Sequence, residues 1–123
     1  MGDTLAELRQ RIQSREVGRC FDLIVLIGQG AQRVSVEPGR HGFVRDVRFI
    51  LDGKNAFAFI PNAQSLNFYF RKPGMTAGWF TLADVTAAFP EAEVKAIGEA
   101  SILIADIDQA LAVARFIAKV ASA

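Results

Sequence analysis

The chain has 123 residues, a length typical of one domain, and 51% of them are hydrophobic while 22% are charged, which excludes an intrinsically disordered chain. No apolar run is longer than five residues, whereas a membrane-spanning helix needs about 20. The net charge of +1 does not identify a partner, although residues 1–72 hold 11 basic and 7 acidic groups and residues 73–123 hold 3 and 6.

A helix is predicted over residues 5–14. Thr4 and Glu7 have the spacing of a capping box, in which each satisfies a backbone amide of the other. The apolar residues that recur at helical spacing behind this box are Leu5, Leu8 and Ile12.

The amino-terminal stretch matches neither a signal peptide nor the myristoylation motif, because Ala6 stands where that motif requires Ser or Thr. Cys20 is the single cysteine, so an internal disulfide is excluded. Cysteine usage of this kind is typical of a reducing compartment, and we expect a cytoplasmic protein that is not associated with a membrane.

Residues 18–29 are apolar on nearly every side, which is typical both of a buried helix and of a central strand. A stripe at helical spacing favours the helix, and Gly28 and Gly30 are interpreted as its stop signals. The segment does not match a phosphate-binding loop, because it lacks the third glycine of a dinucleotide turn and the Lys-Ser/Thr of a P-loop.

An antiparallel meander is predicted over residues 33–71, because apolar residues alternate with a period of two between turn signals. Asp52-Gly53 is the strongest hairpin signal, since both residues of that turn favour positive φ. The expected strands cover residues 33–37, 43–51, 55–60 and 65–71. The large side chains expected to face the helices are Phe49, Phe57, Phe59, Leu66, Phe68 and Phe70.

Residues 72–74 are expected to end the meander, and residues 75–78 to form a flexible loop. Thr81 and Asp84 form a second capping box, which predicts a short helix that Pro90 ends.

A last strand is predicted over residues 101–105, followed by a helix with Asp106 at the N-cap and Gln109 at the third helical position. The buried stripe of this helix is expected to consist of Ile107, Leu111, Ala114, Ile117 and Ala118.

Helices at both ends of an antiparallel meander predict an α+β fold, with a single-layer sheet that carries the N- and C-terminal helices on one face. We expect one domain over residues 1–123, with an N-terminal helical arm over 1–17 and an α+β core over 18–120.

Several segments resemble the small bacterial YdhG-like domains of unknown function. The resemblance extends over roughly residues 18–120 and rests on residues 47–49, 57–61, 66–70, 102–104 and 106–108. It implies an antiparallel sheet packed on helices and a helix over residues 18–29, and it brings no catalytic residues.

No catalytic, cofactor-binding or metal-binding residues are predicted. His41 is the only histidine and lies in a Gly-rich turn without a second catalytic signature, and Cys20 has apolar neighbours. One histidine and one cysteine do not make a transition-metal site, which usually takes three or four ligands. An oxygen-only site built from Glu91, Glu93 or Glu99 stays open as an alternative to solvated charges.

A candidate binding surface is predicted from basic and aromatic residues that come from neighbouring turns and strands. Arg binds carboxylate or phosphate with two hydrogen bonds, and Tyr, Trp and Arg together are typical of interface hot spots. The alternative is a set of scattered solubilising charges, with the tryptophan packed on the core. The members are Arg40, Arg45, Arg48, Tyr69, Arg71, Lys72 and Trp79.

The complete core and the scarcity of reactive residues favour a non-enzymatic binding or interaction domain that forms a homodimer and has a protein or an anionic small molecule as a further possible partner. One alternative is nucleic-acid or anionic-ligand binding through the Arg-rich face, which also includes Arg33. A second alternative is a small enzyme that uses Cys20 or His41.

Overall fold

The structure is a computed structural model that describes residues 3–39 and 45–122. In chain order, its elements are α1 (Leu5–Gln10), α2 (Arg15–Gly30), β1 (Val34–Pro38), β2 (Val47–Leu51), β3 (Lys54–Pro61), β4 (Leu66–Phe70), α3 (Lys72–Thr76), α4 (Leu82–Ala88), β5 (Glu93–Val94), β6 (Ala100–Ile104) and α5 (Ile107–Ser122).

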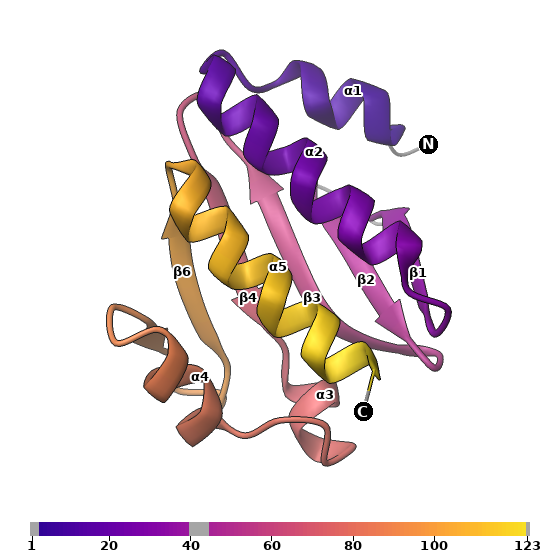
Figure 1. Cartoon of the computed structure of the whole chain (residues 1–123), viewed down its shortest axis with the longest axis vertical. Coiled ribbons are helices and arrows are strands. Elements are labelled where there is room, and N and C mark those ends of the chain that lie inside the picture. Colours follow the sequence, from indigo (N-terminus) through magenta and orange to yellow (C-terminus); the bar gives the residue numbers. More distant parts are fainter. Residues whose placement is uncertain (1–2, 40–44, 123) are drawn as a thin grey trace.

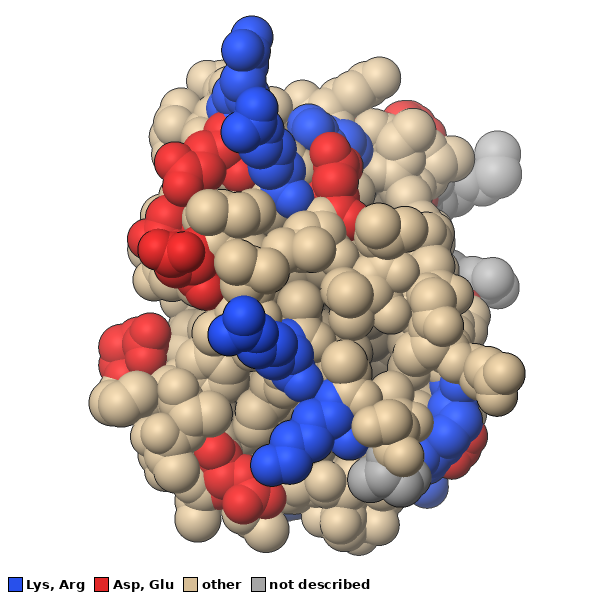
Figure 2. All heavy atoms as spheres, viewed as in Figure 1, with Lys and Arg blue, Asp and Glu red and all other residues tan. Residues whose placement is uncertain are grey.

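Six antiparallel strands form one sheet in the order β1-β2-β3-β4-β6-β5. Helices α2 and α5 lie side by side on one face of this sheet (Figure 1). The predicted α+β fold with helices on one face is therefore confirmed. On the helix side, charged side chains surround a broad uncharged surface (Figure 2). None of the helices formed by the described residues is long and apolar enough to cross a membrane.

The N-terminal helix is shorter than predicted. The capping box of Thr4 and Glu7 is present, with backbone-to-side-chain hydrogen bonds of 3.1 and 3.2 Å, but α1 ends at Gln10. The amides of Gln13 and Ser14 donate instead to the carbonyl of Ala63 in the β3–β4 turn, at 2.8 and 3.1 Å. This tertiary contact interrupts the helix, and Ser14 becomes the N-cap of α2.

The 16 residues of α2 confirm the helical interpretation of residues 18–29, but Gly28 does not stop the helix, which continues to Gly30. Gly28 lies where α2 crosses the sheet, and an added Cβ would stand 2.6 Å from Cε2 of Phe49 and 2.7 Å from Cγ2 of Val36. The glycine is therefore explained by close approach of helix and sheet rather than by helix termination.

The meander is confirmed, and its β2–β3 hairpin has the predicted turn, with φ of 47° at Asp52 and 80° at Gly53. Residues 43 and 44 of the second predicted strand lie outside the described residues. All six side chains expected beneath the helices are at most 1% exposed and belong to the core: Phe49, Phe57, Phe59, Leu66, Phe68 and Phe70. Full burial contributes roughly 1.5–3 kcal/mol for each such side chain.

The region after the meander contains two elements that were not predicted. Residues 72–76 form α3 instead of a turn and a flexible loop, and Gly74 in this helix lies against the ring of Phe80. Residues 93–94 form β5, which pairs with β6. The predicted short helix is confirmed as α4, which is capped by the Thr81–Asp84 box and ends before Pro90.

The last strand and helix are confirmed as β6 and α5, and Gln109 and Asp106 form the expected cap. The predicted buried stripe of α5 is partly wrong, because Leu111 is 38% exposed and Ala118 is exposed. The helix packs against both the sheet and α2, and small side chains allow this close approach. Its buried positions are Ala110, Val113, Ala114, Ile117, Val120 and Ala121.

Gly28→Ala should lower the free energy of unfolding by about 1–2 kcal/mol, because the added methyl group forces Phe49 or Val36 to move. Gly30→Ala is the matched control, since a Cβ there meets nothing within 4 Å, and its effect should lie between zero and a gain of about 1 kcal/mol. Urea unfolding of both variants measures this difference. Equal stability of the two variants would contradict the close packing at Gly28.

Candidate functional site

The face of the sheet opposite the helices carries three of the predicted surface residues. Strand alternation places Arg48 and Tyr69 on this open face, because Phe49, Phe68 and Phe70 point into the core. One row of cross-strand neighbours runs across all six strands in the order Glu37, Arg48, Ala58, Tyr69, Ser101 and Glu93. Arg71 follows β4 and lies beside the same row.

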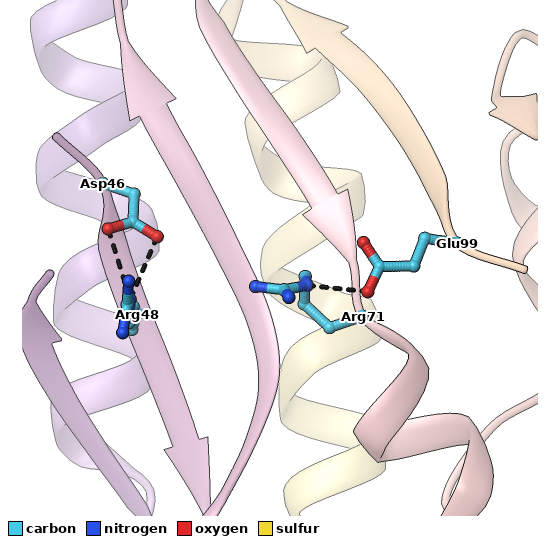
Figure 3. A network of polar contacts seen from close by, with 4 residues as sticks. All are labelled: Asp46, Arg48, Arg71 and Glu99. Carbon is cyan, nitrogen blue, oxygen red and sulfur yellow. Dashed lines mark hydrogen bonds and ion pairs between the residues drawn. The ribbon is translucent and has the colours of Figure 1, made fainter. Parts of the chain in front are cut away.

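Two ion pairs lie on either side of this face, which Figure 3 shows with the helices behind the sheet. Nε of Arg48 donates to the carboxylate of Asp46 at 3.1 and 3.3 Å, and Asp46 is only 4% exposed. Nε of Arg71 donates to Glu99 at 2.8 Å, and the same carboxylate oxygen accepts from the backbone N–H of Lys72 at 3.1 Å. Each arginine charge is therefore balanced within the chain.

The open face also carries a partly exposed, uncharged area on β3, β4 and β6. Asn67 is opposite Ile60 on one side and Leu103 on the other, and Leu103 is 56% exposed. The hydroxyl of Tyr69 accepts from Nδ2 of Asn67 at 3.0 Å, which fixes the direction of the ring. We call these four residues the open-face patch: Ile60, Asn67, Tyr69 and Leu103.

The other predicted surface residues lie elsewhere. Arg45 pairs with Asp3 at 3.3 Å. Trp79 packs partly buried against the core on the helix side, so the sheet separates it from Tyr69. Lys72 is exposed, while Arg40 and His41 lie outside the described residues.

Arg33 belongs to the same basic set and lies near Trp79. Its guanidinium donates to Asp52 at 2.6 and 3.0 Å and stands 5.7 Å from the centroid of the Trp79 ring. Carboxylates thus balance every arginine of the predicted Arg-rich face that the structure describes, and this lowers the attraction of that face for a polyanion.

A second candidate site is a groove of about 580 Å³ on the helix side, bordered by α4 and α5. Its apolar lining includes Trp79, Phe80 and Phe116, and two basic side chains of α5, Arg115 and Lys119, lie at the same groove. Sequence reasoning included only Trp79. The spacing of four residues between Arg115 and Lys119 indicates that they share a helix face, but it does not indicate the neighbouring α4.

Cys20 is fully buried in the core, which does not favour a nucleophilic role. Burial raises the pKa of its thiol, and the negative charges of Glu16 and Asp106 raise that pKa further. Among the residues that the structure describes, no group of three or more His, Cys, Asp or Glu side chains is arranged to hold a metal ion.

Cys20 should therefore react at least about 100-fold more slowly with a disulfide reagent such as Ellman's reagent at pH 8 than in 6 M urea, because little thiolate forms and it is inaccessible. Since the folded pKa is raised, protein stability should fall as the pH rises past the ordinary thiol pKa. Absorbance of the released thiolate measures the reaction. Equal rates in buffer and urea would contradict the burial of Cys20.

Glu99→Ala should lower the free energy of unfolding by about 1–3 kcal/mol, because it leaves the Arg71 guanidinium and the Lys72 N–H without their acceptor. Glu93→Ala is the control, since Glu93 forms an exposed ion pair with Lys95 and should change stability by less than about 0.5 kcal/mol. Urea unfolding compares the two variants, and a larger loss for Glu93→Ala would be inconsistent with a structural role of Glu99.

A scan against protein-family models finds no match for this chain, and searches of curated proteins and of solved structures find no significant match either. What the chain does is therefore inferred from the contacts and charges of its own surfaces.

Proposed function

We propose that this chain is a non-enzymatic interaction domain that forms a homodimer through the open face of its sheet. The observation that supports this proposal is the open-face patch, in which Leu103 is 56% exposed on a sheet face whose two ion pairs are both formed within the chain. A cytoplasmic location is part of the proposal, because one free buried cysteine is typical of a reducing compartment.

The charge distribution favours a second copy of the chain as the partner. A two-fold dimer brings the same patch of both subunits together, so any net charge on the patch would repel itself. Arg48 and Arg71 each have a carboxylate partner, and the four residues of the open-face patch carry no charge. A nucleic acid or anionic ligand would instead be attracted by cations without partners, and this makes the Arg-rich alternative less suited to this face.

The sheet edges favour contact through the face rather than by strand addition. At one edge, β1 includes Pro38, which has no N–H to donate. At the other edge, β5 has only two residues, and Glu93 in it pairs with Lys95 at 3.1 Å. Short, charged or proline-containing edge strands are typical devices against edge-to-edge association.

Leu103→Glu should weaken self-association at least about tenfold, because each two-fold contact would bury two new carboxylates. Leu26→Glu is the matched control, since Leu26 is an even more exposed leucine, at 66%, but lies on α2 on the other side of the sheet. Tyr69→Ala should weaken the dimer in the same direction, as the loss of an aromatic anchor. Sedimentation equilibrium over a range of concentrations measures the dimer constant.

Circular dichroism should show that all three variants keep the wild-type fold, so that the change in mass reports the interface. A wild-type chain that stays monomeric at about 100 µM would contradict the proposal, since specific homodimers generally form well below that concentration. Equal weakening by Leu103→Glu and Leu26→Glu would place the contact elsewhere.

A further inference from the structure

The groove between α4 and α5 combines an aromatic lining with two cations that form no ion pair with any residue that the structure describes. Trp79, Phe80 and Phe116 contribute its aromatic side chains, and alanines of α4 and α5 leave the space beside them open. Its volume of about 580 Å³ lies within the range of about 300–1,000 Å³ that is usual for small-molecule sites. Figure 2 shows basic side chains over α5 next to an uncharged surface that extends toward α4.

The two cations of the groove differ from the arginines of the open sheet face. Arg115 and Lys119 lie one turn apart on α5, both are exposed, and neither forms an ion pair within residues 3–39 and 45–122. Like charges at this spacing repel each other and destabilise a helix slightly. A negative group held between them would remove that cost.

The acidic residue of the groove does not supply that negative group. Among the described residues that line the groove, Asp84 is the only carboxylate, and it accepts from the backbone N–H of Thr81 at 2.9 Å as part of the α4 capping box. Two of the three basic residues in the acidic second half of the chain, residues 73–123, therefore line an apolar groove without an ion-pair partner among the described residues.

We propose that this groove binds a small organic acid with an apolar body. The carboxylate lies between Arg115 and Lys119, and the hydrocarbon or aromatic body packs on Trp79, Phe80 and Phe116. Charge complementarity requires the acid, because an uncharged apolar ligand would leave both cations as they are. The site lies on the helix side and is independent of the open-face patch, so binding and self-association can be tested separately.

Trp79 is the only tryptophan of the chain, so its fluorescence reports directly on the groove. Octanoate should change the Trp79 emission in a saturable way, with a dissociation constant of about 1 mM or lower, as expected for a ligand of this size. Octanol, which has the same apolar chain without the charge, and acetate, which has the charge without the chain, should each give at least about a tenfold weaker response at equal concentration. Isothermal titration calorimetry on the same samples separates binding from quenching.

The double variant Arg115→Gln/Lys119→Gln should weaken octanoate binding at least about tenfold, because it removes both charge-assisted hydrogen bonds. Arg19→Gln/Lys54→Gln is the matched control, since it removes two exposed charges that do not line the groove. Repeating the titration on the Leu103→Glu variant should give the wild-type affinity whether or not the chain dimerises.

Equal binding of octanoate and octanol would overturn the proposal, as would equal weakening by the two double variants. Absence of any saturable change in both fluorescence and calorimetry up to about 10 mM octanoate would overturn it as well, because such weak binding is not specific.

Discussion

The structure depends on one constraint, which is that the phenylalanine rings of the described residues pack together on a single face of the sheet. Phe57, Phe68 and Phe70 contact one another with ring centroids 5.1 to 6.2 Å apart, and Phe80 and Phe116 extend the same cluster toward the helices. Helices α2 and α5 complete this layer. Because the phenylalanine rings lie on the helix side of the sheet, the open face carries small residues, polar residues and single apolar residues. This is the face that we propose as the contact surface.

The two candidate surfaces differ in how their charges are compensated. On the open sheet face, Arg48 and Arg71 are balanced by carboxylates of the same chain, which suits contact with an uncharged or identical surface. At the groove, Arg115 and Lys119 have no such partner in the part of the chain that the structure describes, which suits an acid. The same residue types therefore favour different ligands, and only the positions of the neighbouring carboxylates separate the two cases.

Features that depend on local chemistry could be predicted from the sequence. Both capping boxes, the Asp52-Gly53 turn and the buried face of the meander are set by residues close together in the chain, and the structure confirms each of them. Contacts between distant segments could not be predicted. The carbonyl of Ala63 ends α1, Phe49 explains Gly28, and the pairing of β5 depends on β6. The groove belongs to this second group, because it exists only where α4 lies next to α5.

The Arg33 side chain joins segments that are far apart in the chain. Its guanidinium donates to Asp52 in the β2–β3 turn and to the carbonyl of Ala121 in the last turn of α5, at 3.4 Å, while it also lies over the ring of Trp79. A positive charge at the C-terminal end of α5 also interacts favourably with the negative end of the helix dipole. One planar cation thus links β1, the β2–β3 turn and the last turn of α5, so a change at this single position would be felt in three segments that are remote from one another in the chain.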